Sequence, residues 1–413
     1  MRDISALKQK ILKLADHCVK CGLCSSQCPT YLLKQDENES PRGRIALAQA
    51  VASDAMQAGG KITTHLNNCL QCRRCEASCP SQVKYGDLIT ATNTLLNHEN
   101  QQTKRLNTTL ISKISMLSHN NWLKYTNFIQ LLSRTGLIQF LRLSKTGKRV
   151  LNYLPNNSPE KITQKSPATN QSKIKVSLFT GCFSHIFDKH TLRMSIDLLK
   201  YCGYSVNIPP KQTCCGAIAA RQGLMDTEEK CQLSNQIAFG DTHYSPIVFL
   251  TTGCGAKLKE YQEQLPAKVN FANRVFDITA FLENSELFTK LKFTPLKKKV
   301  LVFSPCSERN VLKQAGIVEK LLSRIPGIEL ASLPKSTGCC GASGSHLITH
   351  QNQADQIRSP ILEQIISLSP DIIISPNYPC NIHIQTGLKE KGLDIPMIHP
   401  IELLYNQADL EQV

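Results

Sequence analysis

Short apolar runs alternate with longer stretches of helix-like spacing through residues 174–413. The runs at residues 174–179, 247–250, 300–303 and 372–374 have the length and composition of buried strands. Strands that alternate with helices favour a parallel sheet covered by helices. Because the same order of strands, helices and turns occurs twice, the pattern predicts two small α/β modules, at residues 174–295 and 296–413.

The first hundred residues have a different pattern, in which short helices connect cysteine-rich loops. Residues 1–17 have the spacing of an amphipathic helix that leads to Cys18. Ser40 and Pro41 have the residue types of an N-cap and a first helical position, so we expect a helix through residues 44–48. The fold class predicted for the whole chain is therefore α/β, with a small helical domain at residues 1–100 ahead of the two modules.

Residues 101–173 form a strongly basic segment between these regions. Apolar residues at helical spacing up to about residue 150 predict one or two amphipathic helices, and a polar linker follows. The segment holds twelve basic residues and one acidic residue, so it accounts for most of the formal net charge of +16. Such local charge is typical of a surface that contacts an acidic protein face or anionic lipid, and a solvated helical hairpin is the alternative.

No run of about eighteen apolar residues occurs in the chain, so the sequence predicts no membrane span and leaves only peripheral contact with a membrane. The first residues also lack the apolar centre of a secretory signal peptide. We therefore expect a reducing, cytoplasmic location, with peripheral contact at the inner face of the cell membrane.

Eight of the eighteen cysteines form two copies of one motif, in which the fourth cysteine precedes a proline. Three thiolates spaced in this way can bind three corners of one iron-sulfur cube, while the fourth reaches the neighbouring cube. The spacing predicts two [4Fe-4S] clusters with crossed ligands. The first cluster would take Cys18, Cys21, Cys24 and Cys79, and the second would take Cys69, Cys72, Cys75 and Cys28.

Zinc and disulfides are the alternatives for these cysteines. Structural zinc usually takes two separated pairs of ligands, which this spacing does not provide. Disulfide scaffolds are short secreted chains, whereas this chain has 413 residues. Two clusters held close together are suited to the transfer of single electrons.

The two α/β modules also repeat a pattern of four cysteines. Cys214 follows Cys182 by 32 residues and Cys339 follows Cys306 by 33, and in each module a Cys-Cys-Gly turn lies between two strand ends. Each module could therefore bring four thiols to one pocket, as a metal or cluster site or as buried or redox-active thiols. The candidate ligands are Cys182, Cys214, Cys215 and Cys254 in the first module, and Cys306, Cys339, Cys340 and Cys380 in the second. Cys202 and Cys231 lie outside the repeat and are expected in the core.

The Cys-Cys-Gly modules resemble the cysteine-rich CCG domain of the heterodisulfide reductase group. The motifs CVKCGLCSSQCPTY at residues 18–31, SPRGRI at 40–45, CLQCRRCEASCP at 69–80 and HPIELL at 399–404 resemble those of glycolate oxidase iron-sulfur subunits. This resemblance implies an iron-sulfur subunit that passes electrons from an FAD-binding 2-hydroxy-acid dehydrogenase subunit to the quinone pool. Relatives with the same layout serve lactate, glycerol 3-phosphate or heterodisulfide oxidoreductases, which gives the alternative function.

Two departures from the family pattern bear on chemistry. Lys257 and His383 stand where heterodisulfide reductases have a fifth thiol in each module, which argues against disulfide cleavage at the CCG sites. Ser307 stands where relatives often have histidine, so no catalytic role is assigned there.

The chain also has no glycine-rich nucleotide-binding motif, and we expect no substrate chemistry on this chain alone. The basic charge would give affinity for nucleic acid, but no nucleic-acid motif accompanies it, and no such partner is expected.

Overall fold

The computed structural model describes residues 4–99, 174–182, 184, 188–240, 245–261, 270–334 and 336–410. The basic helices and linker predicted at residues 101–173 lie outside these ranges. No helix within the ranges combines the length and the apolar character that a bilayer crossing requires. The described residues divide into two compact units. Unit 1 contains residues 4–99, 216–230 and 336–361, and unit 2 contains residues 174–215, 231–334 and 362–410, with the gaps given above.

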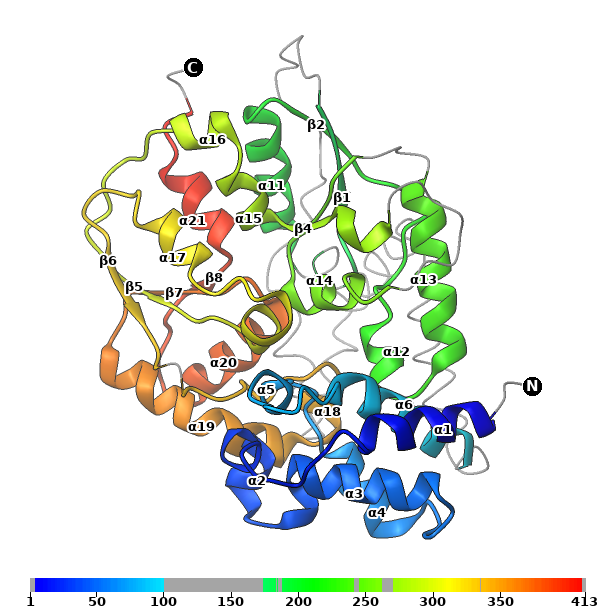
Figure 1. The fold of residues 1–413 in the computed structure, drawn as a ribbon. Coiled ribbons are helices and arrows are strands. Elements are labelled where there is room, and N and C mark those ends of the chain that lie inside the picture. The colour runs from blue at the N-terminus through cyan, green and yellow to red at the C-terminus, as the bar shows by residue number, and fades with distance from the viewer. Residues whose placement is uncertain are drawn as a thin grey trace, which may run out of the picture. The chain divides into compact units, whose positions relative to one another are not determined.

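Unit 1 is built mainly from the short helices at the start of the chain, drawn in blue and cyan in Figure 1. They are α1 (Ile4–Ala15), α2 (Pro29–Lys34), α3 (Pro41–Ala52), α4 (Gly60–Asn67), α5 (Arg74–Ala77) and α6 (Tyr85–Glu99), with 3-10 turns at Ser25–Gln27 and Glu37–Glu39. Helix α1 packs against α3 and α6, and Ile11, Ile45 and Leu88 form part of a buried core there. The predicted start of α3 is confirmed, because the Ser40 hydroxyl accepts a hydrogen bond from the Gly43 amide at 2.9 Å.

Unit 2 contains two four-stranded parallel sheets with the same strand order (Figure 1). The first has the order β2-β1-β3-β4, from β1 (Ile174–Phe179), β2 (Tyr204–Asn207), β3 (Ile247–Phe249) and β4 (Val275–Asp277). The second has the order β6-β5-β7-β8, from β5 (Lys299–Val302), β6 (Glu329–Ser332), β7 (Ile372–Ile374) and β8 (Met397–Ile398). The four central strands are those predicted from the apolar runs, and the repeated order confirms two α/β modules.

The helices of the modules follow the strands in chain order. They are α11 (Lys189–Tyr201), α12 (Ala217–Arg221), α13 (Met225–Gly240), α14 (Thr252–Leu258), α15 (Ile278–Glu283), α16 (Glu286–Lys290), α17 (Ile317–Leu322), α18 (His346–Thr349), α19 (Gln351–Leu368), α20 (Tyr378–Glu390) and α21 (Pro400–Gln407), with a 3-10 turn at Phe271–Arg274 and a π-helix at Ser307–Leu312. Of these, α12 and α18 belong to unit 1, and α13 and α19 begin in unit 1 and end in unit 2.

The two modules share one hydrophobic core within unit 2. Helix α11, which follows the first strand of one module, packs against α21 at the end of the other, and α17 packs in the same reciprocal way against α15. The shared core includes Leu198, Ile278, Leu321 and Ile401, one from each of these four helices. The two modules are therefore joined through one common core.

Gly255 provides a test of the packing next to one strand end. A Cβ atom at this position would lie 2.0 Å from the ring of Phe249, which is fully buried on β3 and cannot move aside. Gly255→Ala should therefore lower the free energy of unfolding by about 1–3 kcal/mol, measured by urea unfolding followed by circular dichroism. At Gly240 a Cβ would meet no atom within 4 Å, so Gly240→Ala is the matched control. Equal destabilisation by both substitutions would contradict the prediction.

Candidate metal centres

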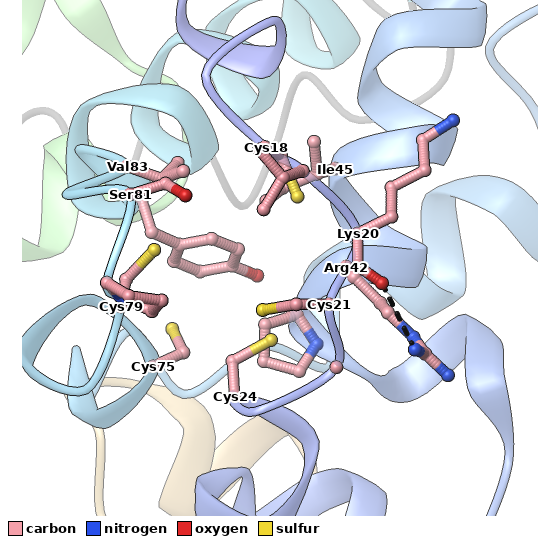
Figure 2. Close-up of a pocket in the computed structure, with 15 residues that line it drawn as sticks. Cys18, Lys20, Cys21, Cys24, Arg42, Ile45, Cys75, Cys79, Ser81 and Val83 are labelled. Atoms are coloured by element: carbon pink, nitrogen blue, oxygen red, sulfur yellow. Dashed lines mark hydrogen bonds between the residues drawn. The ribbon is translucent and has the colours of Figure 1, made fainter.

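The first candidate centre is a pocket of about 430 Å³ in unit 1. Figure 2 shows the thiols that surround it, on the loop after α1, on α5 and on the loop after α5. Its cysteines are Cys18, Cys21, Cys24, Cys75 and Cys79. Left-handed backbone at Lys20 and Gly22 bends the first loop around the pocket. Glycine at residue 22 adopts a φ of +83° without strain, and a Cβ there would lie 2.6 Å from Nη1 of Arg42.

The second candidate centre is a pocket of about 310 Å³ in the same unit. Its cysteines are Cys28, Cys69, Cys72 and Cys75, and Arg44, Arg73 and Tyr85 also line it. Left-handed backbone at Gln71 and Arg73 bends the loop after α4. These two residues lie second and fourth after Cys69, as Lys20 and Gly22 do after Cys18. The repeated motif therefore has a repeated backbone conformation.

The two pockets divide the eight cysteines as the crossed pattern predicts. Cys79 of the second motif lines the first pocket, and Cys28 of the first motif lines the second. Cys75 and Tyr85 line both pockets, so the pockets share a wall. The first pocket thus offers five thiols and the second four, so each holds at least the four donors that a [4Fe-4S] cluster needs. The ligand assignment itself stays a prediction.

Burial makes these thiols poor anions without a cation. Burial and the charge of the neighbouring Cys72 raise the pKa of Cys75 well above its ordinary value, and burial also raises the pKa of Cys24. Iron held by the thiolates would supply the positive charge that stabilises them. The electrostatics of both pockets therefore fit a cationic group.

A buried ion pair next to the second pocket was not predicted from the sequence. Nη2 of Arg44 lies 2.5 Å from Oε2 of Glu39, and both side chains are almost completely buried. The α3 helix, which was predicted from the sequence, carries Arg44. Its partner Glu39 gave no signal, because no motif spacing links it to the cysteines.

The second Cys-Cys-Gly segment also contacts the loop of the second pocket within unit 1. The Ser343 hydroxyl donates to the carbonyl of Leu70 at 2.5 Å, and Nη1 of Arg74 donates to the carbonyls of Ser336 and Thr337 at 3.1 and 3.3 Å. Arg221 adds a bond from Nη2 to the carbonyl of Cys69 at 2.7 Å. Residues 336–343, which include Cys339 and Cys340, are thus fastened to the loop that holds Cys69 and Cys72.

The first module brings its four repeat thiols together in unit 2. Sγ of Cys182 lies 3.7 Å from Sγ of Cys214. Hydrogen bonds to Cys214 and Cys254, together with burial, raise the pKa of Cys215 well above its ordinary value. The convergence of four thiols agrees with the expectation from spacing, and metal ligation there stays a prediction.

Buried polar side chains hold this Cys-Cys turn in place. Nδ2 of Asn235 donates to the carbonyl of Cys214 at 3.0 Å, and the Tyr261 hydroxyl donates to the carbonyl of Cys215 at 3.0 Å. The turn itself passes through Gly216, whose φ of +82° is left-handed as the sequence predicted. Neither Asn235 nor Tyr261 was predicted, because both lie outside the cysteine repeat.

The second module's cysteines divide between the two units. Cys306 and Cys380 belong to unit 2, where Nδ2 of Asn377 donates to Sγ of Cys380 at 3.1 Å, and Cys339 and Cys340 belong to unit 1. Outside the repeat, Cys202 lies in the core shared by the modules, as predicted, and Cys231 is fully buried on α13.

Comparison with known families agrees with these two kinds of site. Residues 14–83 match a family model described as a 4Fe-4S dicluster domain, and residues 176–259 and 300–385 match one described as a cysteine-rich domain. Together the matched residues make up more than half of the chain. The chain therefore belongs to the iron-sulfur proteins in which a 4Fe-4S dicluster domain precedes two cysteine-rich CCG domains.

Similarity over nearly the whole chain is found with glycolate oxidase iron-sulfur subunits, which confirms the resemblance noted in the motifs. The probable glycolate oxidase iron-sulfur subunit of Bacillus subtilis (strain 168) is 28% identical over 95% of this chain and 94% of that protein. The glycolate oxidase iron-sulfur subunit of Escherichia coli (strain K12) is 28% identical over 90% of this chain and 89% of that protein. Lactate utilization protein A of Macrococcus caseolyticus (strain JCSC5402) is 25% identical over 57% of this chain and 98% of that protein.

Substitution of one cysteine tests the assignment of the second pocket. Cys69→Ser should remove about four iron atoms per chain from protein prepared without oxygen, because a serine hydroxyl is a much weaker ligand for iron than a thiolate. Iron and sulfide analysis, with EPR spectra of the reduced protein, measures the loss. Cys202→Ser changes an equally buried thiol in the core of unit 2 and should leave the iron content unchanged. An unchanged iron content in Cys69→Ser would exclude Cys69 as a ligand.

Proposed function

We propose that this chain is the iron-sulfur electron-transfer subunit of a flavin-dependent glycolate dehydrogenase complex. The observation that carries the proposal is the division of eight cysteines between two pockets that share a wall in unit 1. Bound there, two [4Fe-4S] clusters would supply one-electron transfer. The similarity to glycolate oxidase iron-sulfur subunits over most of the chain supports the choice of complex.

The substrate chemistry is assigned to a partner. The sequence has no glycine-rich nucleotide-binding motif that would hold FAD or NAD. An FAD-binding 2-hydroxy-acid dehydrogenase subunit would therefore remove the electrons from the substrate. This chain would receive them singly and deliver them to the quinone pool from the cytoplasmic side of the membrane.

The first pocket is the better candidate for contact with the flavoprotein. Its ligand loop is exposed at Cys21, and the apolar side chains on either side of Cys21, Val19 and Leu23, are 68% and 60% exposed. Lys20 is exposed in the same loop, and residues 17–35 contain no acidic residue. An apolar patch with a positive charge beside a cluster ligand fits a flavoprotein face that is apolar and acidic.

The function is tested by mixing the anaerobically prepared chain with the purified flavoprotein. Glycolate should reduce the clusters, seen as bleaching of visible absorbance and appearance of the EPR signal, and a soluble quinone analogue should reverse the change. Cys69→Ser, which should lack the cluster of the second pocket, is the control that shows which part of the signal comes from that cluster. Clusters that dithionite reduces but that glycolate with the flavoprotein leaves oxidised would contradict the proposal.

A second candidate is the same relay for lactate. It is favoured by the similarity to Lactate utilization protein A, which extends over almost all of that protein. The same assay with lactate and its own dehydrogenase distinguishes the two. If lactate with its dehydrogenase reduces the clusters and glycolate with its dehydrogenase does not, lactate would replace glycolate in the proposal. The electron-transfer role would stand.

The contact at the first pocket makes a prediction about affinity. The double variant Val19→Ser with Leu23→Ser should weaken binding of the flavoprotein at least tenfold, because each side chain loses about 1.5–3 kcal/mol of apolar burial in the complex. Met56→Ser is the matched control, since Met56 is also exposed, at 47%, but lies outside the ligand loop, between α3 and α4. Titration calorimetry measures the affinities. Equal affinity of the double variant and the control would exclude this surface.

The basic residues 101–173 are proposed to contact the flavoprotein or anionic lipid at the membrane surface. Their charge is the support, because positively charged segments bind both acidic protein faces and acidic headgroups.

The CCG thiols of the first module are proposed to hold a further metal or cluster, supported by the convergence of Cys182, Cys214, Cys215 and Cys254.

A further inference from the structure

Arg44 places a positive charge inside unit 1, at the second pocket. Its side chain is 1% exposed, and it lines the pocket together with Cys28 and Cys69. Nη1 lies 3.8 Å from Sγ of Cys28, within hydrogen-bond distance of a sulfur acceptor. A guanidinium group stays charged at any pH that a protein tolerates, so this charge is permanent.

Every nitrogen of the guanidinium group is fixed by further acceptors. Nη1 also donates to the Thr30 hydroxyl at 2.9 Å and to the Glu39 carbonyl at 2.6 Å. Nε donates to the His65 carbonyl at 2.8 Å, and Nη2 donates to the Glu39 carboxylate. The group therefore has one orientation relative to the thiol of Cys28.

The opposite charge of Glu39 is partly offset by other donors. Oε1 of Glu39 lies 2.7 Å from Nδ2 of Asn68, 2.9 Å from Nδ1 of His65 and 3.1 Å from Nζ of Lys34. Although burial works in the other direction, these bonds and the charge of Arg44 keep the pKa of Glu39 below its ordinary value. Glu39 is thus ionised, and it shares its charge among several cationic or polar groups, whereas Arg44 alone of them faces Cys28.

The first pocket has no equivalent among its lining residues. Its basic side chains are Lys20 and Arg42. Lys20 is exposed, and Arg42 is 37% exposed and paired with Glu37, with 2.6 Å between Nε and Oε1. Water and salt screen such charges, while a buried charge acts in a medium of lower dielectric constant.

We propose that Arg44 raises the reduction potential of the second cluster above that of the first and so sets the direction of electron flow between them. Reduction adds a negative charge to a cluster, and a nearby positive charge or a hydrogen bond to a ligand sulfur stabilises the reduced form. The inference rests on the proposed clusters. In it Arg44 is a positioning and tuning residue, not a ligand.

The test is a redox titration of the full chain, prepared anaerobically and followed by EPR. Arg44→Gln should lower the higher of the two midpoint potentials by at least about 59 mV, which corresponds to a tenfold change in the equilibrium constant of a one-electron reduction. Glu39→Gln should raise the same potential, because it removes a negative charge. Arg44→Lys, which keeps the charge, should shift it less than Arg44→Gln does. The lower potential should stay constant in all three.

Arg42→Gln is the matched control, since it removes an arginine charge at the exposed first pocket. It should change the reduction equilibrium constant of either cluster less than twofold. A purely structural role would predict that Arg44→Gln and Glu39→Gln have the same effect, so shifts of both in one direction would overturn the inference. If the Arg44→Gln variant does not bind the second cluster, the potential of the second cluster in Glu39→Gln decides. A potential that does not rise in Glu39→Gln would overturn the inference. Iron analysis keeps the two proposals apart: a wild-type chain without clusters refutes the proposed function, whereas clusters with unshifted potentials refute only the role of Arg44.

Discussion

The constraint on which unit 1 depends is the cost of gathering thiolates in a buried space. Four negatively charged sulfur atoms repel one another, and burial adds to the free energy of each. In the structure, a short, tightly bent loop carries each set of three cysteines, and the other motif supplies the fourth cysteine. It also places the guanidinium of Arg44 against the more buried set. The less buried set has Cys21 at the surface, and the basic residues in the described lining of its pocket, Lys20 and Arg42, are in contact with water.

Unit 2 depends on a different constraint, because its two modules bury apolar helix faces against each other. The two modules share a core, and each covers part of the other through the reciprocal pairs α11 with α21 and α15 with α17. The first module brings four thiols together, with Asn235 and Tyr261 holding the carbonyls of the Cys-Cys turn.

Much of this arrangement could be predicted from the sequence because it repeats. The apolar runs predicted the four central strands, and the doubled cysteine motif predicted two groups of thiols that agree with the pocket linings except that Cys75 lines both pockets. The edge strands β2, β4, β6 and β8 were missed, since they are two to four residues long and most are partly exposed, which leaves no apolar run to detect. The Glu39–Arg44 pair and the bond from Ser343 to Leu70 were also missed. Such contacts join segments with no shared spacing, and only the tertiary fold brings them together.

The crossed division of cysteines has a consequence for biosynthesis. The first pocket takes Cys79 from the second motif and the second pocket takes Cys28 from the first, so the second set of four is complete only when residue 75 has been made and the first only at residue 79. Iron delivery during translation would have to wait until both motifs have left the ribosome. The two halves of the dicluster domain would then mature together, as one event late in the synthesis of that domain.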